Sequence, residues 1–131
     1  MQRIVIDTNV IISSAISTQG NPAKIMDLVL NKKFEVYYSS EIIAEYVRVF
    51  AKPRLNFTRE IQEFFINGIK RVGILIDPPA STFPMLDESD RVFYDLAKEV
   101  GAIVITGNTK HYPDGDFIMT PSEFLEFINY E

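Results

Sequence analysis

The sequence predicts an α/β fold built on a mainly parallel β-sheet, and two observations support this prediction. Short runs of β-branched residues alternate with longer segments of helical periodicity, which is typical of a parallel sheet covered by helices on both faces. The chain has 131 residues, of which 47% are hydrophobic and 12% aromatic, so it can fill a single core. We therefore expect residues 1–131 to form one domain.

The strands are expected at short apolar runs that end in polar or turn residues. The first of these, Ile4-Val5-Ile6, runs directly into Asp7. Four runs have the length of an ordinary strand and the last is shorter. We therefore expect a sheet of four to five strands. The expected strands are Arg3–Ile6, Glu35–Tyr38, Gly73–Ile76, Ala102–Thr106 and Phe117–Met119.

The helices are expected between the strands, and several have a clear start signal. Ser39 or Ser40 can cap one helix, Thr58 another, and the segment Thr120-Pro121-Ser122-Glu123 has the spacing of a capping box. Pro53 ends the helix that starts near Ser40. The expected helices lie within Asn21–Lys33, from Ser39 or Ser40 to Phe50, after Thr58, at Asp87–Val100 and after Thr120.

The composition excludes several classes of protein. There is no cysteine, so the chain has neither a disulfide framework nor a thiolate metal site. The apolar run before Asp7 is too short for a signal peptide or a membrane span, and we expect a cytoplasmic protein. The net charge is −5, yet Arg48, Lys52, Arg54 and Arg59 fall within twelve residues. This basic run is either a solvated helix end or a track for nucleic acid.

Acidic residues follow strands or begin helices on this predicted scaffold. Asp7 follows the first strand, Glu45 lies on the helix after the second, and Asp90 lies in the first turn of a later helix. Each has a structural explanation, as a helix cap, a partner of the helix dipole or a partner of a lysine. However, parallel strands bring their carboxyl ends to one edge, where two carboxylates ~4 Å apart repel by about 4 kcal/mol at an effective dielectric near 20. Three acids placed together would require a proton or a cation.

The available ligands indicate which cation fits. All-oxygen ligands with one histidine and no cysteine suit Mg²⁺ or Mn²⁺ and do not suit structural zinc. A cation of this kind generates hydroxide and neutralises charge on a phosphodiester. The pattern therefore favours a nuclease or another phosphoryl-transfer hydrolase. A dinucleotide-binding fold is excluded because no glycine-rich turn follows Ile6.

Four segments in series resemble the PIN domain family, within the group described as the toxin component of bacterial toxin-antitoxin systems (VapC-like). The segments are IVIDTNVIISS, SSEIIAEYVRVF, DESDRVFYDLA and AIVITGNTKHYP. The resemblance implies a three-layer α/β/α sandwich and a metal-dependent ribonuclease that cleaves single-stranded or looped RNA with metal-activated water. It also implies a cognate antitoxin protein as partner and a homodimer.

The resemblance assigns roles residue by residue. Asp7, Glu45 and Asp90 match the first three acids of the family, which bind Mg²⁺ or Mn²⁺. Asn108 takes the fourth position, where many members have aspartate, so it keeps an oxygen ligand and loses a negative charge. We expect one tight metal site on Asp7 and Asp90, Glu45 bound directly or through water, and weaker binding of a second ion. The supporting positions are Thr8, Asn9, Asp87 and Thr106.

The expected RNA contacts come from basic side chains near these acids. Five positions are candidates: Arg48, Lys52, Arg54, Lys110 and His111. The alternative hypothesis is a catalytically weak PIN-fold module that binds RNA or protein, and the feature in its favour is Asn108.

Overall fold

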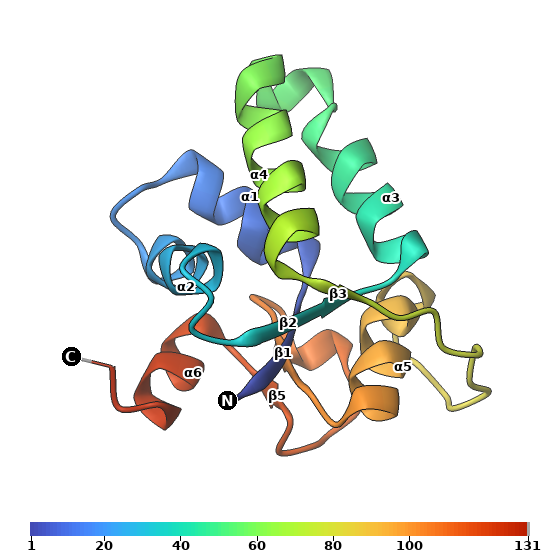
Figure 1. Cartoon of the computed structure of the whole chain (residues 1–131). Helices are drawn as coiled ribbons and strands as arrows, with labels where there is room; N and C mark the ends of the chain where they lie inside the picture. The colour runs from blue at the N-terminus through green and yellow to red at the C-terminus, as the bar shows by residue number, and fades with distance from the viewer. Residues whose placement is uncertain (131) are drawn as a thin grey trace.

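The sheet has five parallel strands in the order β3-β2-β1-β4-β5, in a computed structural model that describes residues 1–130 (Figure 1). The predicted α/β class and parallel sheet are thus confirmed. The third, fourth and fifth strands are shorter than the apolar runs suggested. The strands are β1 (Arg3–Ile6), β2 (Glu35–Tyr38), β3 (Ile74–Leu75), β4 (Ile103–Ile105) and β5 (Ile118–Met119).

Within residues 1–130, six α-helices cover this sheet, and they give the three layers of the predicted sandwich. Figure 1 shows α1 to α4 above the strands and α5 below them, while α6 packs against α2 and β5. Across residues 1–130, no helix has the length and hydrophobicity that a membrane span requires. The helices are α1 (Thr8–Ile16), α2 (Asn21–Leu30), α3 (Ser40–Phe50), α4 (Arg59–Val72), α5 (Arg91–Val100) and α6 (Pro121–Phe127), with short 3₁₀ turns η1 (Pro53–Leu55), η2 (Glu88–Asp90) and η3 (Thr109–His111).

Three helices begin at the expected caps. The Ser39 hydroxyl accepts a hydrogen bond from the backbone N–H of Ile42 at 3.1 Å, and the Thr58 hydroxyl accepts one from Ile61 at 3.1 Å. Thr120 forms the complete capping box with Glu123 at the start of α6. These side chains satisfy backbone donors that the first helical turn leaves free.

The helix expected from Asp87 begins later, at Arg91, so its predicted start was wrong. The Asp87 carboxylate accepts hydrogen bonds from the backbone and hydroxyl of Ser89, at 3.0 and 2.7 Å. This tight turn shapes η2, the short 3₁₀ segment that carries Asp90 and precedes α5. Asp90 therefore lies at the junction between a 3₁₀ turn and a helix.

Strand β1 is the centre of the fold and determines where Asp7 lies. Ile4 and Ile6 are fully buried, and β1 pairs with β2 on one side and β4 on the other. The register Ile6↔Ile105 brings the ends of β1 and β4 together, and the Asp7 N–H donates to the Ile105 carbonyl at 2.9 Å. Asp7 therefore occupies the middle of the sheet's carboxyl edge.

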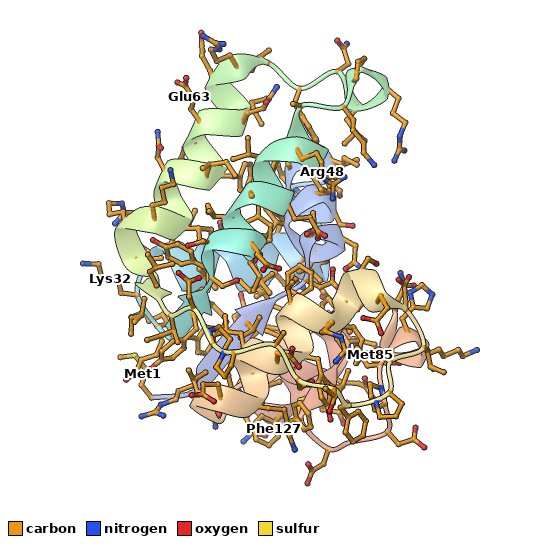
Figure 2. The ribbon with its side chains drawn as sticks, turned by 90° about the vertical axis from the view of Figure 1, so that its right-hand side faces the viewer. Met1, Lys32, Arg48, Glu63, Met85 and Phe127 are labelled. Carbon is orange, nitrogen blue, oxygen red and sulfur yellow. The ribbon has the colours of Figure 1, made fainter. Side chains whose placement is uncertain are left out.

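Two side chains of α5 fasten the long segment between β3 and η2. The Asp95 carboxylate, which is buried, accepts hydrogen bonds from the N–H and hydroxyl of Ser81 at 2.9 and 2.6 Å. Arg91 donates to the carbonyls of Ser81 and Phe83 at 2.8 and 2.7 Å. In Figure 2 this segment, which carries the labelled Met85, runs beside α5. These contacts fix how the chain approaches η2.

Removal of the Asp95 carboxylate should release this segment and lower stability. We expect Asp95→Ala to reduce the free energy of unfolding by about 1–3 kcal/mol, because both bonds to Ser81 are lost from a buried acceptor. Urea unfolding measures the change. Glu99→Ala, at an exposed position of the same helix, should stay within about 0.5 kcal/mol of the wild type. Equal losses in both variants would contradict the role given to Asp95.

Candidate active site and metal centre

The Asp7 carboxylate is held by two hydroxyl groups rather than used as a helix cap. Asp7 occupies the cap position of α1, but its side chain makes no capping hydrogen bond. Its Oδ2 atom accepts from the Thr106 hydroxyl and from the Tyr112 phenol, each at 2.9 Å. All three residues are buried. The orientation of Asp7 is therefore set by groups that follow β4.

Glu45 is connected to the start of α1. The Thr8 hydroxyl donates to Glu45 Oε2, and an Arg48 guanidinium nitrogen lies 3.6 Å from Glu45 Oε1. The Glu45 side chain is 19% exposed, so one side of it faces solvent. Thr8, the residue directly after Asp7, thus connects the acid on α3 to the start of α1.

Asn9 ties the start of α1 to the turn after β4. Its side-chain oxygen accepts from the Gly107 N–H at 3.0 Å, and its amide nitrogen lies 3.5 Å from the Thr106 hydroxyl. Thr106 also accepts from the backbone N–H of Asn108 at 3.1 Å. These contacts hold the β4 end in a fixed position relative to Asp7.

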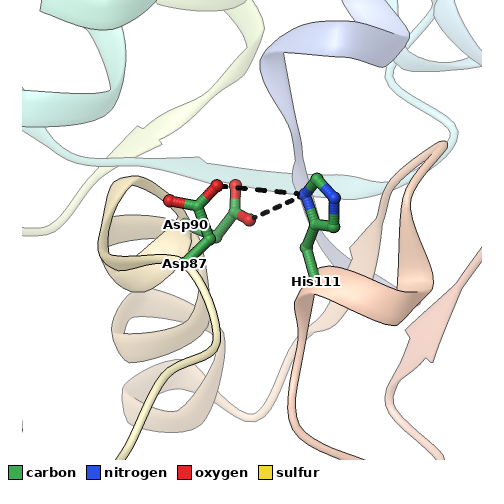
Figure 3. Close-up of side chains that lie close together, drawn as sticks. All are labelled: Asp87, Asp90 and His111. Atoms are coloured by element: carbon green, nitrogen blue, oxygen red, sulfur yellow. Dashed lines mark ion pairs between the residues drawn. The ribbon is translucent and has the colours of Figure 1, made fainter.

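Asp90 forms the second acidic position, together with Asp87 and His111. Asp90 is only 9% exposed, and its Oδ2 atom has no hydrogen-bond partner in the part of the chain that the structure describes. His111 Nδ1 lies 3.6 Å from this atom and 4.0 Å from Asp87 Oδ2. Figure 3 shows the imidazole of His111, from η3, facing the carboxylates of Asp87 and Asp90. These three residues are called the His111 cluster below.

Asn108 contacts the site through its backbone. The residue is exposed, its N–H bonds to Thr106, and its carbonyl accepts from the His111 N–H at 3.0 Å. Lys110 is exposed on the same turn. Lys52 and Arg54 lie beyond the end of α3, at η1.

Burial and mutual repulsion alter how these acids titrate. The pKa of Asp90 rises to about 7 through burial first, then the negative charges of Asp7, Asp87 and Glu45, and His111 opposes this shift. Burial also raises the pKa of Asp7, and hydrogen bonds from Tyr112 and Thr106 offset part of that rise. The charges of Asp7, Asp87 and Glu45 therefore all favour the protonated form of Asp90.

The donor atoms of this region fit a divalent cation. Within residues 1–130, one group of three acidic or histidine side chains has potential ligand atoms all within 4.8 Å of one another, and that group is the His111 cluster. It includes Asp90 of the expected ligand set but not Asp7 or Glu45. Asp90 Oδ2 is a buried carboxyl oxygen without a donor in the part of the chain that the structure describes, and a cation would supply the missing partner.

Sequence reasoning missed Tyr112 and underestimated His111. Tyr112 is 2% exposed and bonds directly to Asp7, yet it lies in no periodic segment of the sequence. Its position directly after His111, in the turn that follows β4, was the only available signal. That turn contributes more to the site than its composition suggests.

The fold and the site together define an α/β protein with an acidic centre at the carboxyl edge of a parallel sheet. The chain belongs to the PIN domain family, whose model matches residues 3–110. The family predicted from the four sequence segments is thus confirmed. PIN domains are generally nucleases.

Two further comparisons extend the match over most of the chain. An uncharacterized protein of Methanocaldococcus jannaschii, MJ1680, is 34% identical over 141 aligned positions, which cover 95% of this chain and 90% of that protein. A crystal structure of VapBC2 from Rickettsia felis, bound to a DNA fragment from their promoter, has a similar chain with a TM-score of 0.59 and 17% identity. The match covers 90% of this chain and 97% of that chain, and it establishes the likeness of the fold.

The raised pKa of Asp90 predicts how stability depends on pH in the presence of a chelator. The ordinary pKa is 3.8 and the folded value is about 7, so between these values the native state binds more protons than the unfolded state. The contribution of Asp90 to stability therefore falls as the pH rises through this window. Asp90→Asn lacks this pH-dependent loss. We therefore expect the Tm of Asp90→Asn minus the Tm of the wild type to increase as the pH rises from about 4 to about 7.

Thermal unfolding in EDTA at a series of pH values measures this difference. Asp27→Asn, which removes an exposed acid of α2, is the matched control and should show no such trend. If the difference in Tm between Asp90→Asn and the wild type stays constant from about pH 4 to pH 7, the pKa of Asp90 is not raised.

Proposed function

We propose that the protein is a single-domain, Mg²⁺- or Mn²⁺-dependent endoribonuclease that cleaves single-stranded or looped RNA. The observation that carries this proposal is the placement of three acids that are far apart in the sequence: Asp7 is buried at the carboxyl end of β1, Glu45 accepts from the adjacent Thr8, and buried Asp90 has an oxygen without a hydrogen-bond partner among residues 1–130. Such a group of carboxylates suits a divalent cation. Membership of the PIN domain family supports the same activity.

The proposed metal ligands are Asp7 and Asp90, with Glu45 bound directly or through water and Asn108 as a weaker oxygen ligand. When bound, the cation supplies activated water and neutralises charge on the phosphodiester. The protein contributes the orientation of the ligands. Thr106 and Tyr112 hold Asp7, and Thr8 holds Glu45. Asp87 supports η2 through Ser89.

Basic side chains near the acids would bind the RNA phosphates. Arg48 lies beside Glu45, and Lys110 and His111 lie on η3, the turn next to Asn108. Lys52 and Arg54 extend the positive charge along η1. Because the whole chain carries a net charge of −5, this local positive charge is needed to attract a polyanion.

The proposed biological role is that of the toxin in a toxin-antitoxin pair, acting in the cytoplasm. The likeness to the VapBC2 structure supports an antitoxin protein as partner. A homodimer is also proposed, because α3 and α4 expose apolar side chains at Val47, Ile61 and Phe64. Phe64 is 61% exposed, which is unusual for so large an apolar side chain.

The second candidate is a catalytically weak PIN-fold module that binds RNA or protein. Asn108 favours it, because an amide binds a cation less strongly than a carboxylate. The two candidates differ in whether a chelator abolishes cleavage, and this can be measured directly.

Asp7→Asn should abolish cleavage without unfolding the protein. We expect loss of more than about 100-fold in the rate of Mn²⁺-dependent cleavage of single-stranded RNA, since even the outer partners of metal ligands contribute about 10–100-fold. Tm should be unchanged or higher, because a buried charge is removed. Gel-based cleavage assays, with and without EDTA, measure the rate.

Asp27→Asn is the matched control and should keep full activity. If the wild type shows no cleavage that EDTA removes, the binding module is the better description. Cleavage that persists in Asp7→Asn would point to a contaminating nuclease.

Salt dependence tests whether the basic side chains bind phosphates. Each phosphate contact on a single strand contributes about −0.7 to the slope of log K against log salt concentration. We expect the double substitution Lys52→Gln, Arg54→Gln to make this slope less steep by about 1.4. Fluorescence anisotropy of labelled RNA, in the Asp7→Asn background, measures binding without cleavage.

Lys32→Gln, Lys33→Gln removes the same charge from an exposed turn after α2 and is the control. Equal changes of slope in the two double variants would show that the effect comes from net charge rather than from local contacts.

A further inference from the structure

The His111 cluster combines two carboxylates with the single histidine of the chain. The ligand atoms come from η2 and its cap residue (Asp90 and Asp87) and from η3 (His111), which follow different strands. They all lie within 4.8 Å of one another. Figure 3 shows the imidazole nitrogen aimed at both carboxylates. The fold therefore brings a nitrogen ligand to the acids of the proposed active site.

The surroundings of the Asp90 carboxyl group are a second, independent observation, and they indicate that a ligand binds at the His111 cluster. Asp90 is 9% exposed as a residue and 12% exposed at its side chain, and Oδ2 lacks a hydrogen-bond partner among residues 1–130. This is the atom that lies 3.6 Å from His111 Nδ1. The separation is too long for a hydrogen bond.

These separations suit two ligands of one ion. Neighbouring ligands at about 2.0–2.2 Å from a metal lie about 2.8–3.6 Å apart at octahedral or tetrahedral angles. The 3.6 Å from His111 Nδ1 to Asp90 Oδ2 lies at the upper end of this range, and the 4.0 Å to Asp87 Oδ2 is slightly longer. The side chains of His111 and Asp87 are 51% and 45% exposed, so the site is open to solvent and to a substrate.

We propose that His111 is a direct metal ligand, together with Asp90 and Asp87, and that it makes the site prefer Mn²⁺ and Co²⁺ to Mg²⁺. This inference rests on the proposed metal-dependent function, because it concerns the same cation. Imidazole binds ions later in the first transition series more strongly, whereas Mg²⁺ favours oxygen ligands and retains its water. His111 would thus increase the affinity of the site for the cation, to which the neutral Asn108 contributes less than a carboxylate would.

Pulsed EPR of the Mn²⁺-bound protein gives the sharpest test, on a preparation without a histidine tag. The chain has one histidine, so imidazole-nitrogen coupling to Mn²⁺ can arise only from His111. We expect this coupling in the wild type and its loss in His111→Asn. Absence of nitrogen coupling in a wild-type sample with Mn²⁺ bound would overturn the proposal.

Isothermal titration with Mg²⁺, Mn²⁺ and Co²⁺, in the absence of RNA, tests the preference. His111→Asn should weaken Mn²⁺ and Co²⁺ binding by about 10–100-fold and change Mg²⁺ binding by less than about 3-fold. His111→Asp, which restores an oxygen ligand, should strengthen Mg²⁺ binding and reduce the preference for Co²⁺. Parallel changes for all three ions in both variants would contradict direct ligation by nitrogen.

These results separate the inference from the proposed function. Nitrogen coupling without RNA cleavage would support the His111 ligand and reject the ribonuclease. Mn²⁺-dependent cleavage without nitrogen coupling would keep the ribonuclease and reject the ligand.

Discussion

Repulsion between carboxylates at the carboxyl edge of the sheet is the constraint to which the rest of the site is adapted. Asp7 cannot move away, because β1 pairs on both sides and its apolar residues are fully buried. Two hydroxyl groups donate to the same Asp7 oxygen, which offsets part of the cost of burial. Asp90 Oδ2 has no such donor within residues 1–130, and burial first and then the charges of Asp7, Asp87 and Glu45 raise the Asp90 pKa to about 7. A proton or a cation must balance that charge.

The sequence predicted the sheet and most helix starts, because these depend on local patterns. β-Branched runs marked all five strands, and Ser39, Thr58 and Thr120 cap the helices that follow them. The sequence also predicted that residues directly after the strands lie close together, because parallel strands have their carboxyl ends at one edge of the sheet. The family resemblance added the proposed roles of Glu45 and Asp90 as metal ligands, which periodicity alone leaves open.

The remainder of the site depends on contacts between segments that are distant in the sequence. Tyr112 reaches Asp7 across 105 positions, and the turn that directs it has neither helical nor strand periodicity. The segment between β3 and η2 likewise owes its course to Arg91 and Asp95, which look like ordinary polar positions of an amphipathic helix. The later start of α5 also follows from a side-chain contact, between Asp87 and Ser89.

The replacement of aspartate by Asn108 is consistent with this electrostatic balance. A fourth carboxylate beside Thr106 would add negative charge to a site in which Asp90 already holds its proton to about pH 7. The amide avoids that charge, and the same turn places His111 opposite Asp90 and Asp87. Cation binding would then displace a proton from Asp90 at neutral pH, which couples metal affinity to pH. The turn after β4 therefore affects the charge of the site and, in our proposal, the choice of ion that neutralises it.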